Sequence, residues 1–154
     1  MKEKIYVHYG HEKFEPEKLL NRKRDPFLQK YKPTGLWGSP VDSEWGWIDW
    51  CKSEGFRPER LKTSFKFKID PSARILEVRN PDDVRSYIIA EEHRFPDDTI
   101  FYDYSLDTSQ IEKEYDGMEV YMNDNYNELH NTPIFYVWDV DSLVVWNPDM
   151  VIPQ

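Results

Sequence analysis

Alternation of hydrophobic and polar residues predicts a series of short strands along the chain. The clearest case is residues 63–69, where Phe65, Phe67 and Ile69 alternate with Lys66 and Lys68. This period of two is typical of a strand with one buried face. Similar but weaker patterns predict strands at 4–9, around 36–37, and at 74–78, 118–122, 134–138 and 143–146.

A second pattern, in which hydrophobic residues recur three and four apart, predicts helices between these strands. In residues 43–55, Trp47, Trp50 and Cys51 have this spacing, and Ser43 and Gly55 are suited to cap the two ends. We therefore expect Trp47 and Trp50 to be mostly buried. Further helices are predicted for 15–27 with its exit loop, for a segment that begins at 80–81 and fades by 95–96, and for 108–115.

The order of these elements bounds the fold class. The strands cluster without the regular strand–helix alternation of a doubly wound protein, so we expect an α+β fold with helices beside a mixed or antiparallel sheet. A chain of 154 residues fits a single domain over 1–154. Aromatic residues make up 16% of it, which is far too much apolar mass for a disordered chain.

Charge and apolar content narrow the classes of function. The net charge of −9 weighs against a protein that coats nucleic acid, because phosphate binding needs clustered Lys and Arg. The one basic patch, Arg22-Lys23-Arg24, fits a solvated helix face or loop better than a binding site. No apolar run approaches the ~20 residues that cross a bilayer, and the first residues lack the apolar stretch of a secretory signal. We expect no membrane partner and a cytoplasmic location.

Four polar features lie in unusual places. His8 sits inside a predicted strand, Ser39 follows an aromatic residue in a glycine-rich turn, Glu119 sits inside another strand, and Asp139 and Asp141 lie between two strands. An acid within a strand is disfavoured and is costly to bury unpaired. Glu119 is therefore either an edge residue that faces water or a functional group, and the same two alternatives hold for His8.

The absence of several well-known short motifs argues against several enzyme classes. The Walker lysine motif, GxGxxG, HExxH and GxSxG are all missing from the sequence, which argues against most nucleotide-phosphate, zinc-protease and serine-hydrolase sites. His8 and His11 are three residues apart across a glycine turn, but the sequence places no third ligand beside them. The single Cys51 rules out an internal disulfide and a cysteine-rich zinc site. The sequence therefore predicts no metal site.

Taken in order, several segments resemble the ADP-ribosyltransferase superfamily, in particular its small bacterial and phage-type members. They are Ile5-Tyr-Val-His-Tyr-Gly10, Gly35-Leu-Trp-Gly-Ser-Pro40 with the Trp-rich helix behind it, Tyr115-Asp-Gly-Met-Glu-Val120 and the closing segment 138–146. The resemblance implies a split, strongly bent, mixed or antiparallel sheet whose cleft binds NAD⁺. It also implies transfer of ADP-ribose from NAD⁺ to a macromolecular acceptor, protein or nucleic acid, with release of nicotinamide.

The resemblance also assigns residues. NAD⁺ binding is assigned to His8, Tyr9, Gly10, Trp37 and Ser39. The catalytic carboxylate is assigned to Glu119, because breaking the nicotinamide–ribose bond develops positive charge on the ribose that a carboxylate stabilises. Gly117 stands where arginine-modifying members carry a second acid, which argues against arginine as the acceptor.

Two other functions stay open at this point. A related enzyme type, the RNA 2′-phosphotransferases, uses NAD⁺ to remove a phosphate and relies on several His and Arg residues. The candidates here are His8, His11, Arg22 and Arg24. The other alternative is a non-enzymatic interaction domain of a phage or defence system, in which the many Trp and Tyr residues make a protein-binding face. NAD⁺ turnover separates these possibilities.

Overall fold

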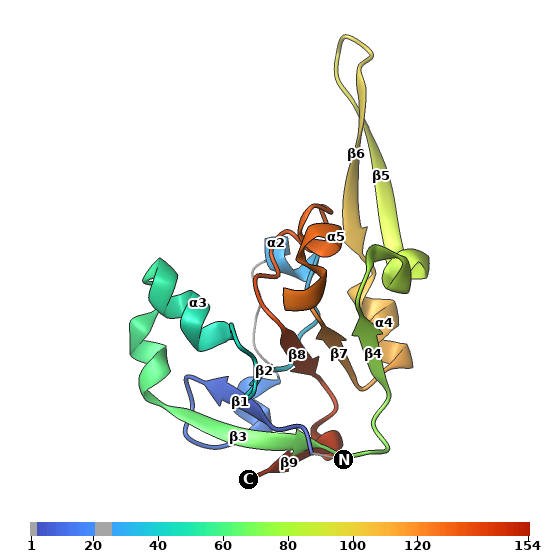
Figure 1. Ribbon diagram of the computed structural model, residues 1–154. Coiled ribbons are helices and arrows are strands. Elements are labelled where there is room, and N and C mark those ends of the chain that lie inside the picture. Colours follow the sequence, from blue (N-terminus) through green and yellow to red (C-terminus); the bar gives the residue numbers. More distant parts are fainter. Residues whose placement is uncertain (1–2, 21–25) are drawn as a thin grey trace.

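A seven-stranded, mostly antiparallel sheet forms the centre of the molecule (Figure 1). The structure is a computed structural model that describes residues 3–20 and 26–154. The strand order is β4-β7-β8-β2-β1-β3-β9, and only β4 and β7 run parallel to each other. The strands are β1 (Tyr6–Tyr9), β2 (Leu36–Pro40), β3 (Ser64–Ile69), β4 (Ile75–Val78), β7 (Gly117–Val120), β8 (Ser142–Val145) and β9 (Val151–Pro153). The predicted mixed α+β class is confirmed.

Within residues 3–20 and 26–154, five short α-helices accompany the sheet: α1 (Pro16–Leu19), α2 (Pro26–Gln29), α3 (Trp47–Glu54), α4 (Thr108–Glu114) and α5 (Tyr126–His130). Turns of 3-10 helix occur at Pro58–Lys62, Pro81–Tyr87, Asn123–Asn125 and Pro148–Met150. None of the helices in the described ranges has the length and apolar character needed to cross a membrane.

Hydrophobic residues cover both faces of the sheet. One cluster contains Tyr6, Leu36, Phe65, Phe67, Leu143, Val145 and Val151. The other is built from β4, β7, α4, α5 and the segment before β8, with Trp138 as its largest fully buried side chain. Since β1 lies between β2 and β3, Tyr6, Val7 and His8 are all buried. One-sided alternation at 4–9 was therefore a poor guide to burial in this strand.

Three predictions about elements were wrong in part. The helix predicted to run from 80 towards 95 ends at Tyr87, and residues Ile88–Arg94 form β5, which pairs with β6 (Ile100–Leu106) in a separate two-stranded sheet. The strand predicted at 134–138 is a series of turns. For 15–27 the sequence predicted a short helix and an exit loop stopped by Pro26. The short helix is present as α1, but Pro26 begins α2 instead of a loop stop, and residues 21–25 with their basic patch lie outside the described ranges.

The helix predicted at 43–55 begins later than expected. α3 starts at Trp47, with Gly46 rather than Ser43 before its first turn, and the Asp49 carboxylate accepts a hydrogen bond of 2.9 Å from the Gly46 N–H. Its end is as predicted, because Gly55 adopts the left-handed conformation at φ 62°. This late start brings the beginning of α3 against β2, where the candidate site lies.

Candidate functional site

A cleft with a volume of about 450 Å³ lies where β1, β2, α3 and the segment before β8 meet. Its lining includes five Tyr, Trp and Phe side chains, which come from β1, β2, α3 with its exit and the segment before β8: Tyr9, Trp37, Trp47, Phe56 and Trp138. The volume is within the range of pockets that hold small organic ligands.

Four of the five residues predicted to bind the cofactor line this one cleft: His8, Tyr9, Trp37 and Ser39. Gly10 and the predicted catalytic Glu119 are not among the described residues that line it. Gly10 has φ +109°, a conformation that favours glycine, and its N–H donates a hydrogen bond of 2.9 Å to the Thr63 carbonyl. Gly10 thus allows the chain to turn after β1.

His8 is the first residue of β1 beyond the end of the β1–β2 ladder. These strands pair only through Tyr6 with Pro40 and Val7 with Ser39. Beyond that point His8 Nδ1 lies 2.8 Å from the Trp37 carbonyl oxygen. Because a carbonyl oxygen only accepts, Nδ1 must carry the hydrogen. The buried imidazole therefore holds the Trp37 backbone at the edge of the cleft.

A second histidine continues this arrangement. His8 Nε2 lies 2.9 Å from His11 Nδ1, and the two rings stack with centroids 5.1 Å apart. Since His8 Nδ1 carries a hydrogen, Nε2 of a neutral His8 ring has none and can only accept. The hydrogen between the two rings is then on His11 Nδ1, which donates it to His8 Nε2. Both rings line the cleft, so this pair can place one extra proton beside a bound ligand.

Ser39 has a structural partner of its own. Its Oγ accepts a hydrogen bond of 3.3 Å from the N–H of Trp47, the first residue of α3. A hydroxyl from a neighbouring strand thus satisfies one of the unpaired N–H groups at the start of the helix. Ser39 thereby fixes Trp47 against the cleft.

Three permanent cations, Lys32, Arg57 and Arg60, also line the cleft. Lys32 Nζ lies 5.4 Å from the ring centroid of Trp37 and 5.7 Å from that of Trp138, a geometry that favours cation–π attraction. Arg57 adopts φ 43° and ψ 53°, a conformation that non-glycine residues rarely adopt and that the fold must enforce. In a chain with net charge −9, the cleft is a local positive region.

Asp139 is the one acid among the described residues that line the cleft. Burial raises the pKa of this carboxyl above its usual range, while Lys32 and His130 act in the opposite direction. Neither a hydrogen bond nor an ion pair within 4 Å engages its carboxylate in the described ranges. A half-buried carboxylate left in this state beside a cavity is a candidate functional group. The sequence marked Asp139 as unusual but assigned it no role.

Glu119 lies in a different environment. Its buried carboxylate accepts hydrogen bonds from Tyr6 at 2.9 Å and from Lys4 Nζ at 2.6 Å. The strand register places Glu119 opposite Leu143, and Leu143 opposite Gly38, so all three share one face of the sheet. Ser39, the next residue along β2, points to the other face. Ser39 and Glu119 therefore lie on opposite faces of the sheet, and the buried Glu119 is not the solvent-facing edge acid that was one alternative.

Cys51 borders the cleft as a protonated thiol. It is buried, and desolvation raises its pKa to about 11. Because the thiolate is the nucleophilic form, this environment does not favour covalent catalysis by Cys51 at neutral pH.

Sequence reasoning missed Arg57 and Arg60. Both belong to the segment that links α3 to β3, and their positions reach the cleft only because Gly55 reverses the chain after α3. An Arg two residues after the helix-ending Gly55 and directly before Pro58 was the available signal.

Comparison with known proteins gave no match among protein-family models, curated proteins or solved structures. The geometry of the cleft therefore carries the functional argument.

Proposed function

We propose that the cleft binds NAD⁺ and that the protein is a mono-ADP-ribosyltransferase, which transfers ADP-ribose to a macromolecular acceptor and releases nicotinamide. The observation that carries this proposal is the convergence of His8, Tyr9, Trp37 and Ser39 on one cleft from two strands. These residues come from two of the segments that carry the resemblance to ADP-ribosyltransferases. The short β1–β2 ladder beside them is compatible with the split sheet which that resemblance implies.

The chemistry of the lining matches a dinucleotide. NAD⁺ has two flat bases joined through a diphosphate, and it needs aromatic surfaces at its ends and positive charge between them. The cleft supplies Trp37 and Trp47 as ring surfaces, with Arg57 and Arg60 as cations suited to phosphate oxygens. A glycine-rich phosphate loop is not needed where side chains provide this charge.

In this proposal, Asp139 supplies the carboxylate that stabilises positive charge on the ribose. In the reaction the bond between the nicotinamide nitrogen and ribose C1′ breaks, and its electron pair leaves with neutral nicotinamide. The ribose becomes positively charged until an acceptor atom bonds to C1′ and loses its proton. A carboxylate in the cleft stabilises that transient charge. Asp139 lines the cleft and Glu119 does not, so the geometry favours Asp139.

Turnover and binding of NAD⁺ test the proposal together. Nicotinamide release from NAD⁺ is measured for the wild type and for Asp139→Asn, and NAD⁺ affinity is followed by quenching of tryptophan fluorescence. We expect Asp139→Asn to bind NAD⁺ normally and to release nicotinamide roughly a hundredfold more slowly, as for loss of one preorganised charge-stabilising group. Full activity in folded Asp139→Asn would remove Asp139 from the mechanism.

Two tryptophan variants test NAD⁺ binding separately from turnover. Trp37→Ala should weaken NAD⁺ binding, whereas Trp45→Ala should not, because Trp45 is exposed and is not among the described lining residues. Wild-type protein that neither binds NAD⁺ nor releases nicotinamide would overturn the proposal and leave an interaction domain as the alternative.

One observation favours the 2′-phosphotransferase as a second candidate. His8 and His11 are in contact, and they share the cleft with Arg57 and Arg60, a set suited to a phosphate. The same assay separates the two activities. Nicotinamide release that requires RNA carrying a 2′-phosphate would indicate the phosphotransferase.

A further inference from the structure

The β5–β6 hairpin projects from the body of the molecule as a two-stranded arm (Figure 1). Its base is held by backbone hydrogen bonds from Leu106 N–H to the Lys30 carbonyl and from Asp107 N–H to the Tyr87 carbonyl. Beyond the base most of its side chains are exposed, including Tyr102 at 54%. An isolated pair of strands is only marginally stable in water. Contacts between its own strands must therefore hold the outer part of the arm.

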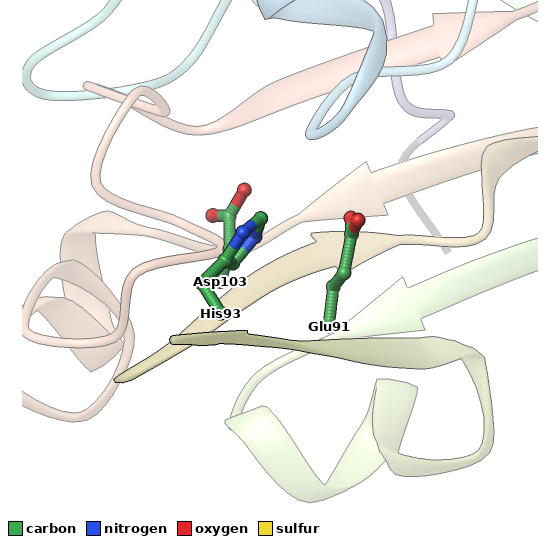
Figure 2. A group of neighbouring side chains, drawn as sticks. All are labelled: Glu91, His93 and Asp103. Carbon is green, nitrogen blue, oxygen red and sulfur yellow. The ribbon is translucent and has the colours of Figure 1, made fainter. Parts of the chain in front are cut away.

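Three potential metal ligands stand on one face of this arm. Glu91 and Asp103 are directly opposite each other in the strand register, and His93 lies two residues beyond Glu91 on the same face. Figure 2 shows the three side chains projecting from the same side of the hairpin. One ligand atom from each residue lies within 4.8 Å of the others.

This arrangement places two like charges opposite each other on one face of the arm. Two carboxylates directly opposite each other in an antiparallel pair repel. Lys30 Nζ contacts one oxygen of Asp103 at 3.2 Å, and this ion pair balances part of the charge. In the described ranges no hydrogen bond or ion pair engages the Glu91 carboxylate or the ring nitrogens of His93. The His93 ring instead stacks on Phe101 at 4.8 Å, which holds it beside the two acids.

We propose that Glu91, His93 and Asp103 form a binding site for a divalent transition-metal ion of the Zn²⁺ type. An imidazole together with two carboxylates suits zinc better than magnesium or calcium, which prefer oxygen ligands alone. Bonds of ~2.0–2.2 Å to a tetrahedral ion place ligand atoms about 3.4 Å apart. Small side-chain rotations close the observed spacing to this value, and water completes the coordination.

The bound ion would join β5 to β6 and neutralise the facing carboxylates. Its effect would be to order the outer part of an arm that has no hydrophobic core of its own. The site lies in the separate two-stranded sheet, and none of its three ligands lines the NAD⁺ cleft. The metal proposal therefore does not depend on the proposed enzyme activity.

Titration of the full chain with Zn²⁺ alone, by calorimetry and by competition with a coloured chelator, tests the site. We expect saturable binding of one ion, weakened by at least about tenfold in His93→Gln and in Glu91→Gln, since even the loss of a partner that orients a ligand has effects of that size. Glu92→Gln is the matched control. It removes the same charge from the same strand, but Glu92 pairs with Tyr102 on the opposite face, so zinc affinity should not change.

Two further measurements locate the ion. Lys30→Ala removes a positive charge beside the site and should tighten zinc binding several-fold. Zinc should slow amide hydrogen exchange in residues 88–106 of the wild type but not of His93→Gln. His11→Gln controls for zinc held by the His8–His11 pair.

Several results would overturn the proposal. They are the absence of saturable binding at millimolar zinc, equal affinity in wild type and His93→Gln, weaker binding in Lys30→Ala, or protection from exchange that appears only outside the hairpin. Because Glu91→Gln, Glu92→Gln and His93→Gln change side chains on the arm and not in a hydrophobic core, their melting curves without metal should match that of the wild type.

Discussion

The phenol of Tyr6 lies 2.9 and 3.0 Å from the two carboxylate oxygens of Glu119, although the two residues are 113 positions apart in the sequence. Tyr6 reaches from β1 towards β7 across two intervening strands, with its ring stacked on Phe67. Lys4 and Tyr121 also bond to this carboxylate. Glu119 is thus the centre of a buried polar network that joins the two halves of the sheet.

Replacing Glu119 with Gln separates this structural role from catalysis. The amide keeps an acceptor for Tyr6 but loses the charge that holds Lys4, so we expect unfolding free energy to fall by about 1–2 kcal/mol. Nicotinamide release should persist in the folded variant, because Glu119 lies outside the lining of the cleft. Denaturant titration and the turnover assay measure the two effects. A stable variant with a hundredfold loss of turnover would return the catalytic role to Glu119.

Stability should decline at alkaline pH. Burial, and then the charge of Glu119, raises the pKa of Tyr6 above its ordinary value of 10.0, and the pKa of Tyr121 is raised for the same reasons. Because the folded pKa exceeds the unfolded one, the stabilisation is complete below pH ~10 and is lost as the pH rises above it, by about 1.4 kcal/mol per pH unit for each such tyrosine.

Tyr6→Phe tests this pH dependence. Melting curves between pH 8 and pH 11 should show a shallower decline for Tyr6→Phe than for the wild type. Tyr136→Phe, which removes a hydroxyl from a side chain that is 65% exposed, serves as the control and should follow the wild type. Parallel curves for Tyr6→Phe and wild type would contradict the prediction.

Gly38→Ala tests whether the Tyr6 and Phe67 rings pack over β2 because residue 38 has no side chain. A Cβ at Gly38 would lie 2.5 Å from the Phe67 ring and 3.1 Å from the Tyr6 Cβ. The rings would have to shift, and overpacking of this kind typically costs about 1–3 kcal/mol. The shift should also weaken the Tyr6–Glu119 bond. Equilibrium unfolding measures the loss, and an unchanged midpoint would mean that the rings move freely.

The two stacked tryptophans of α3 should differ in function. Contrary to the sequence prediction, Trp47 and Trp50 are only half-buried, and their rings stack on each other at 5.1 Å. Trp50→Ala should therefore destabilise the fold by roughly 1–2 kcal/mol, less than the 3–5 kcal/mol typical of a fully buried ring. Because only Trp47 lines the cleft, Trp47→Ala should weaken NAD⁺ binding and Trp50→Ala should not. Equal affinities in the two variants would contradict this assignment.

The β5–β6 hairpin shows why part of the fold escaped prediction. Its residues lie on a ribbon with both faces largely exposed, so burial imposes no period of two on their hydrophobicity. The strong helix start at Asn80-Pro81 is real, but it produces only the 3-10 segment that ends at Tyr87. Reading 88–95 as helix also separated Glu91 from His93, which share a face only when the segment is a strand.

The sequence by itself determined the features that depend on near neighbours. The alternation in β3 and the left-handed glycine that ends α3 are set by side chains within a few residues, and both are present as predicted. Tertiary structure alone decided the partners of the polar groups. Glu119 lies with Tyr6 and not in the cleft, while Asp139 lies in the cleft with Trp37. Strand order and register set these partnerships, and they arise from contacts between distant segments that no local pattern encodes.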